Sequence, residues 1–292
     1  MTDDTDYFKG VLLVVAATIC FAFQPVFGHL AYADGANAVG LLWLRFLLAA
    51  ILLQLITWRA STQGWLSPLL IGVVLSTGAL CYFFALSQLS VGLATLLFFL
   101  FPVYIFFFSV LLRQESVSLM KFNAIIFAMI GIYISVDTDS ALPLWGITCG
   151  LIAGACYGAY IMLSNHFLVH KKPFESLSWV TTGALICLSV PALAGQAELP
   201  DSYVGYGAAF GLCLVSTLLS FSLLMAGTRL MRRATDVAVL TTTEIGSTLF
   251  LAWLLLNENV TTEEIIGAGL VFIAAVIILV SRQREVRSAL AE

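Results

Sequence analysis

Apolar residues gather along the chain in ten long runs, which short polar connections separate. A helix needs roughly 20 mostly apolar residues to cross about 30 Å of hydrocarbon, and each run is close to that length. The pattern therefore predicts an all-α integral membrane protein with ten transmembrane helices. The predicted spans are 10–32, 38–57, 66–88, 91–112, 119–136, 144–168, 174–195, 203–228, 235–256 and 263–281.

The basic residues predict how the spans thread through the membrane. With the N-terminus placed inside, the inside segments carry all of the 13 Lys and Arg residues except Arg45, which lies within the second span. Basic residues collect in the cytoplasmic loops of membrane proteins. We therefore expect a multi-pass protein of the bacterial cytoplasmic (inner) membrane, with cytoplasmic N- and C-termini.

The two halves of the chain resemble each other. Residues 111–118 read LLRQESVS around Glu115, and residues 254–261 read LLLNENVT around Glu258, 143 positions later. Each half has five spans, an odd number, so the second half must enter the membrane upside down. We predict two inverted five-helix repeats, at 1–140 and 141–292, a plan common among secondary transporters.

Composition narrows the possible functions. Charged residues make up 10% of the chain, against about 25% in soluble proteins. No block of Lys and Arg could follow a phosphate backbone, so nucleic acid is not a predicted partner. The six cysteines lie inside apolar runs, and the three histidines are too scattered for a metal cluster. We predict neither a metal nor another cofactor.

Two ionisable residues lie well inside predicted spans, where a charge is costly and usually faces a cavity or a partner. Glu244, in the ninth span, is either a group that binds a coupling proton or a substrate ammonium, or a structural carboxyl held by neighbouring threonines. Arg45, in the second span, contacts substrate, ties its helix to neighbouring carbonyls or snorkels outward.

Five further residues complete the candidate substrate site. Gln24 precedes Pro25, and the pair interrupts the first span, where a proline frees a backbone carbonyl. His29 lies at the end of the same span and is either an ordinary interfacial histidine or part of a cavity mouth. Tyrosine hydroxyl groups deep in a span need partners, and a cavity lining would provide them. The tyrosines are Tyr82, Tyr104 and Tyr157.

Glycines recur every fourth residue along the sixth span, at Gly146, Gly150, Gly154 and Gly158. Such a stripe lets a second helix approach closely in lipid, so we read it as a packing surface. The run Gly205 to Gly211 lacks the spacing of a nucleotide-binding loop, and no strand precedes it.

Several of these segments resemble the drug/metabolite transporter (DMT) superfamily, specifically its EamA-type ten-helix members. The resemblance rests on LLWLRFLLA at 41–49, CYFFALSQLSVGLATLL at 81–97 and FPV at 101–103. The chain departs from the family pattern at Gln114 and Asn257, where glycine is usual. Among the members, it looks most like the YddG-type exporters of aromatic amino acids.

The resemblance and the candidate residues together predict a secondary transporter, not an enzyme. We expect export of small amphipathic metabolites, with aromatic or neutral amino acids first, by alternating access at a central cavity. The chain would act as a monomer or a weak dimer, with a proton as a possible coupling ion. A broad-specificity drug exporter of the same fold is the alternative, and a channel or a membrane enzyme is remote.

Overall fold

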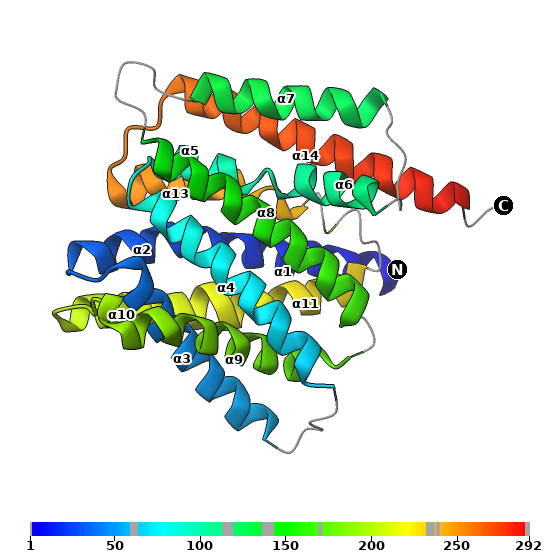
Figure 1. The fold of residues 1–292 in the computed structure, drawn as a ribbon. Coiled ribbons are helices and arrows are strands. Elements are labelled where there is room, and N and C mark those ends of the chain that lie inside the picture. The colour runs from blue at the N-terminus through cyan, green and yellow to red at the C-terminus, as the bar shows by residue number, and fades with distance from the viewer. Residues whose placement is uncertain are drawn as a thin grey trace.

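The computed structural model describes residues 2–58, 64–112, 119–135, 143–168, 171–231, 237 and 240–289, which form a helical bundle without strands in these ranges (Figure 1). The helices are α1 (Thr2–Ala22), α2 (Gln24–Ala33), α3 (Ala38–Thr57), α4 (Leu66–Leu86), α5 (Val91–Phe98), α6 (Phe101–Leu111), α7 (Leu119–Ser135), α8 (Leu144–Phe167), α9 (Pro173–Pro191), α10 (Tyr203–Cys213), α11 (Ser220–Met231), α13 (Glu244–Leu256) and α14 (Thr262–Ala289). Two π-helical turns, η1 (Ala192–Gln196) and η2 (Leu214–Leu219), extend α9 and join α10 to α11.

The predicted spans coincide with these helices. Within the described ranges, seven helices or helix pairs are long and apolar enough to cross a membrane, and 122–135 and 244–256 form shorter apolar helices. The tenth span is α14. The expected all-α, ten-span transporter fold is therefore confirmed. Of the ninth predicted span, only 237 and 240–256 fall within the described residues.

Helices from the two halves pair in a two-fold pattern. α1 packs against α11, and its counterpart α8 packs against α4, while α3 pairs with α9 and α7 with α14. Figure 1 shows α7 and α14 side by side along one edge of the bundle, far from α3. A second half that enters inverted is consistent with this pattern, in which α3 and α7 each meet their own counterpart while α1 and α8 exchange equivalent partners.

Glycines allow some of these helices to approach closely. A Cβ atom at Gly72 of α4 would collide with the carbonyl oxygen of Val180 of α9, and one at Gly183 of α9 would collide with that of Leu69 of α4. Small residues let helix backbones pack tightly in lipid, where no hydrophobic force brings helices together. The two reciprocal contacts fix α4 against α9.

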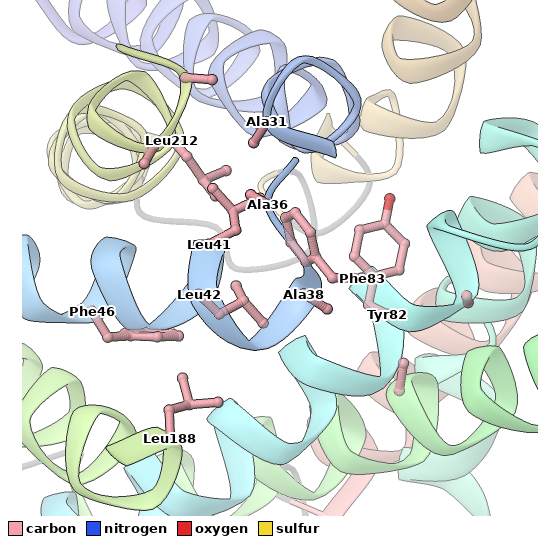
Figure 2. Close-up of a cluster of buried hydrophobic side chains, with 14 of the residues drawn as sticks. Ala31, Ala36, Ala38, Leu41, Leu42, Phe46, Tyr82, Phe83, Leu188 and Leu212 are labelled. Atoms are coloured by element: carbon pink, nitrogen blue, oxygen red, sulfur yellow. The ribbon is translucent and has the colours of Figure 1, made fainter. Parts of the chain in front are cut away.

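The largest buried cluster lies where α2, α3, α4, α9 and α10 meet. Leu41, Leu42 and Phe46 of α3 form its centre, with Phe83 of α4 and Leu212 of α10 around them (Figure 2). Tyr82, beside Phe83 on α4, has its hydroxyl group at the edge of this cluster (Figure 2). This packing fixes the position of Tyr82 for the candidate site.

Connections at opposite ends of the bundle are tied by hydrogen bonds. Asp34, after α2, accepts hydrogen bonds from the backbone N–H and the hydroxyl group of Ser202, at 2.8 and 2.7 Å, and from the N–H of Gly205 at 3.1 Å. At the other end, the Lys171 ammonium donates to the Gly64 carbonyl oxygen. We call these two ends the Asp34 end and the Lys171 end. The Glu115 motif lies outside the described residues.

Candidate functional site

Two spans, one in each half, are interrupted near their middle. The fourth span breaks at Phe99 and Leu100, between α5 and α6, and Pro102 lies in the first turn of α6. The ninth span turns at Thr242 and Thr243 before α13 begins at Glu244. The first residues of the two half-helices, Phe101 and Glu244, are 143 positions apart, the same offset that relates Glu115 to Glu258. The break is therefore a feature of both repeats.

Aromatic rings from three spans meet at the break in the fourth span. The ring of Phe98 lies 5.0 Å from that of Tyr82 and 4.8 Å from that of Tyr157, measured between centroids. Phe101 lies 5.0 Å from Tyr157, edge to face, and Tyr160 stacks on Tyr157 at 5.7 Å. Aromatic pairs at these separations attract each other beyond simple burial. The rings form a continuous apolar wall.

Glu244 brings a carboxylate to this wall. It interacts electrostatically with the hydroxyl groups of both Tyr82 and Tyr157. Its side chain is only half-buried by accessible surface, although protein surrounds it. Water can therefore reach the Glu244 side chain, although it lies deep in the bundle. We call Tyr82, Phe98, Phe101, Tyr157 and Glu244 the central site.

The glycine stripe of α8 places Tyr157 in this site. A Cβ atom at Gly154 would lie 2.9 Å from the carbonyl oxygen of Leu97 and 3.0 Å from that of Phe98. A Cβ atom at Gly158 would lie 3.1 Å from the carbonyl oxygen of Phe101. Only a helix without side chains on this face can lie so close to the broken fourth span, and the expected role of the stripe in packing is visible here.

Arg45 is held away from Glu244 by its own partners. Its Nε donates to the Thr217 hydroxyl oxygen at 3.0 Å, and its Nη1 donates to the Gln24 Oε1 at 3.0 Å. The Thr217 hydroxyl group donates in turn to the Leu212 carbonyl oxygen, five residues earlier, across the wide π-helical turn. Arg45 is 6% exposed. It thus joins α3 to α2 and η2 through side-chain oxygen atoms.

The predicted site residues fall into separate places. Tyr82, Tyr157 and Glu244 come together in the central site, and Gln24 comes together with Arg45. His29 is exposed on α2. Tyr104 packs on the glycine stripe, close to Gly154, and its ring lies 6.4 Å from that of Phe108, one turn along α6. These separate locations show which candidates share one site.

Sequence reasoning missed three residues of this region. Phe98 and Phe101 were hidden among many apolar aromatics, and Thr95, whose hydroxyl group lies 3.3 Å from that of Tyr82, resembled an ordinary buried threonine. The offset of 143 residues would have revealed Phe101, because it makes Phe101 the counterpart of Glu244 in the first repeat. No signal in the sequence distinguishes Thr95.

Known proteins match almost the whole chain. The model of the EamA-like transporter family matches residues 8–136 and, a second time, residues 144–280. The uncharacterized transporter YcbK of Bacillus subtilis (strain 168) is 25% identical over an alignment of 296 residues, which covers 90% of each chain. The uncharacterized transporter sll1319 of Synechocystis sp. (strain ATCC 27184 / PCC 6803 / Kazusa) is 25% identical over 301 residues, with the same coverage.

A solved crystal structure has the same fold. It superimposes with a TM-score of 0.66 and covers 94% of this chain and 98% of its own, at 15% sequence identity. None of these three proteins is named for a substrate. One family model matches the chain twice, and the two matches span most of the sequence. The helical bundle agrees with this match. This chain is a multi-pass membrane protein that belongs to the EamA-like transporter family, within the DMT superfamily.

Proposed function

We propose that the chain is a secondary transporter that exports small amphipathic metabolites carrying an amino group, by alternating access at the central site. Aromatic and neutral amino acids are the first candidates, as in the YddG-type exporters that the sequence resembles. The observation that carries the proposal is Glu244, a carboxylate placed against aromatic rings at the break of a membrane span.

The chemistry of the central site suits such a molecule. A carboxylate binds an ammonium group by charge and hydrogen bonding. The rings of Tyr157 and Phe98 offer faces on which an apolar or aromatic group stacks, and tyrosine faces attract cations. The two half-helices that begin at the breaks, α6 and α13, each bring their first residue, Phe101 or Glu244, to the site.

Export requires a defined orientation. Lys171 and Lys172 lie at the end opposite to Asp34. The sequence predicts that every other Lys and Arg residue, except Arg45, lies on the same side of the membrane as these two. We assign the Lys171 end and both termini to the cytoplasm of a bacterial cell, and the Asp34 end to the outside, because basic loops stay in the cytoplasm. Substrate then enters from the Lys171 end.

A second candidate is a broad-specificity exporter of organic cations. The contacts of Arg45 favour it, because the guanidinium group is bonded to Thr217 and Gln24 and does not interact with Glu244. A zwitterion at the central site would therefore lack this guanidinium as a partner for its carboxylate. A cation needs no such partner.

Transport in proteoliposomes tests both candidates. The panel is phenylalanine, its decarboxylated amine 2-phenylethylamine and its deaminated acid 3-phenylpropionate. We expect saturable transport of at least one of the two amines and none of the acid, with loss of transport in Glu244→Gln. The exposed Glu198→Gln is the matched control and should leave transport unchanged.

The result separates the candidates. Transport of phenylalanine in preference to 2-phenylethylamine supports the amino acid exporter, and the reverse order supports the cation exporter. Equal transport by wild-type protein and Glu244→Gln would contradict the role of the central site. An imposed pH gradient that drives substrate movement in the wild type would show that a proton is the coupling ion.

A further inference from the structure

The two halves are joined at the Asp34 end by two carboxylates of the second half. Val91, the first residue of α5, donates its N–H to Glu258 Oε1 at 2.8 Å. The Ser90 hydroxyl group donates to Glu264 Oε1 at 2.6 Å. Negative groups at the start of a helix are favoured by the unpaired N–H groups and the helix dipole there. We call these four residues the clamp.

Glu264 is itself held in place. Its backbone N–H donates to the Thr261 hydroxyl oxygen, and the Thr261 backbone N–H donates to Glu264 Oε2, at 3.2 Å each. This reciprocal arrangement is the capping box at the start of α14. Glu264 is 6% exposed, so the clamp is a fixed contact and not a loose surface pair.

Below the clamp, α5, α13 and α14 are packed together through apolar side chains. Leu96 and Phe99 of α5 contact Ile245 and Leu249 of α13, and all four side chains are buried. A Cβ atom at Gly92 would lie 3.1 Å from Leu249 and 2.8 Å from Glu264 Oε1, so the backbone of α5 lies directly on the other two helices. We call this packed region the seam.

The seam leads from the clamp to the central site. α5 begins at the clamp and ends at Phe98, and α13 begins at Glu244 and ends two residues before Glu258. Between them, Thr95 of α5 is hydrogen bonded to Tyr82. The two half-helices therefore form the wall between the central site and the Asp34 end, and they must separate if a substrate is to leave there.

The groups around Glu258 make the clamp sensitive to pH. Burial raises the pKa of the Glu258 carboxyl above its ordinary value, the Glu264 charge raises it further, and the Val91 N–H lowers it in part. Tyr82 of α4 also interacts with Glu258. α5 contributes no ionisable side chain, and α13 contributes Glu244. On α2, which also packs on α13, His29 is exposed, and among the described residues no ion pair joins it to Glu258.

The sign of the effect follows from linkage. The buried, clamped carboxyl binds a proton more tightly than the same carboxyl would when exposed to water by an open seam. Protons therefore favour the clamped state, and their removal favours the open one.

We propose that the clamp and the seam form the outer gate of the central site, closed in this structure and held closed more firmly when the outside is acidic. The proposal rests on the transport function and the orientation proposed above. It places proton sensitivity at the outer face, independent of any proton that Glu244 carries.

The sequence confines this carboxylate pair to one end of the protein. With the offset of 143 residues, Glu115 in the first repeat corresponds to Glu258, but the residue that corresponds to Glu264 is Lys121. The sequence of the first repeat thus has a carboxylate and an ammonium group at the positions that correspond to the two carboxylates of the clamp. In the clamp both groups are acidic, and a proton relieves their repulsion.

Labelling of a cysteine placed within the seam tests the gate. Leu249→Cys is buried in the seam, so a membrane-impermeant maleimide added outside reaches it only when the gate opens. The parent protein, with its native cysteines, gives the background rate. Because a maleimide reacts with the thiolate, every cysteine is labelled faster at higher pH, and the rate of Leu249→Cys is therefore divided by that of Leu199→Cys, an exposed position at the Asp34 end. We expect this ratio to rise several-fold as the external pH goes from about 5 to about 8, across the range of a raised glutamate pKa.

Changes in the clamp should alter this ratio. With Leu249→Cys present, Glu258→Gln should abolish its pH dependence, and Glu258→Ala should raise it at every pH. Ser90→Ala, which keeps both carboxylates, should also raise it and serves as the second variant if Glu258→Ala fails to give a monodisperse protein. Glu263→Gln, an exposed neighbour on α14, is the matched control.

The labelling experiment needs no substrate, so its result does not depend on whether the proposed function is correct. A pH dependence of the ratio that persists in Glu258→Gln, or a ratio that does not change in Ser90→Ala, would overturn the gate even if transport of amines is observed. A responsive gate without transport of any panel member would leave the gate standing and remove the proposed substrate class.

Discussion

At the scale of single residues, two charged groups are accommodated in the apolar bundle in different ways. Arg45 is buried and donates to oxygen atoms of Thr217 and Gln24, whereas Glu244 is half-buried beside aromatic rings. The first arrangement satisfies a charge permanently with protein groups, and the second leaves it available to a small molecule. Membrane proteins keep intramembrane charges for either purpose.

Arg45→Ala should therefore cost stability and leave recognition intact. The substitution leaves a cavity and removes the donor from two oxygen atoms, which together cost on the order of 2–4 kcal/mol. We expect a clearly lower melting temperature of the detergent-purified protein and an unchanged Kd for a transported amine. A large loss of affinity at unchanged stability would instead make Arg45 a substrate ligand.

Asp34, in the loops at the Asp34 end, contributes to the stability of the folded protein, and this contribution depends on pH. The Ser202 hydroxyl and N–H groups hold the pKa of Asp34 below its ordinary value, with smaller help from the N–H groups of Gly205 and Asp201. A lowered pKa in the folded state means that this contribution is complete above about pH 4, the unfolded value, and is lost as the pH falls further.

Asp34→Asn tests this sign. The melting temperature of the wild type should fall more steeply than that of the variant as the pH is lowered from about 5 to about 3, because only the wild type has the carboxylate to lose. At neutral pH the variant should be the less stable of the two. Parallel curves for the two proteins would show that the loop contacts of Asp34 do not depend on its charge.

The residues also show where sequence reasoning ends. Tyr82, Tyr157 and Glu244 could be proposed from their polar groups within apolar runs, because such groups need a reason to be there. The separation of Arg45 from Glu244 could not be foreseen, because it depends on Thr217 and on a π-helical turn that brings that hydroxyl group to α3. Polarity identifies a candidate, but packing decides which candidates meet.

At the scale of helices, the interruptions of the fourth and ninth spans create the central site. Pro102 explains the first break, since a proline cannot donate the hydrogen bond that would continue the helix. The second break lies in a run of threonines, where the Thr243 hydroxyl group donates to the Leu240 carbonyl oxygen at 2.6 Å. A proline marks the first break in the sequence, but nothing comparable marks the second, because threonine interrupts a helix only in a suitable context.

The glycine stripe of α8 gives a sharp test at this scale. Gly154→Ala should force α8 away from the Leu97 and Phe98 carbonyl oxygens and displace Tyr157, at a cost of about 1–3 kcal/mol. We expect lower stability and a marked loss of transport. Gly207→Ala in α10, where a Cβ atom meets nothing within 4 Å, is the control and should be neutral or slightly stabilising. Equal effects of the two variants would contradict the close contact.

At the scale of the whole molecule, the span count and the fold followed from hydropathy alone, because lipid demands long apolar helices with satisfied backbones. The pairing of helices across the two halves did not follow from hydropathy. It required the inversion of the second half, which the Glu115 and Glu258 motifs indicated, and close glycine contacts that only coordinates reveal. The domain boundaries at 140 and 141 stay a prediction.

Orientation in the membrane is testable at this scale. Leu199, near the Asp34 end, and Trp65, near the Lys171 end, are both exposed in connections between spans. An impermeant thiol reagent added to intact cells should label Leu199→Cys but reach Trp65→Cys only after permeabilisation. Labelling in the opposite order would invert the assigned topology and move the proposed outer gate to the cytoplasmic side.

The exchange of helix partners between the halves bears on how the protein is made. When the ribosome has released the first five spans into the bilayer, α1 still lacks α11, α4 lacks α8, and Arg45 has Gln24 but not Thr217. The early half must therefore persist as a loosely assembled intermediate until synthesis of the later half completes it. Two fragments severed between α7 and α8 and produced in the same cell should accordingly recover one functional carrier, whereas either fragment produced alone should be degraded.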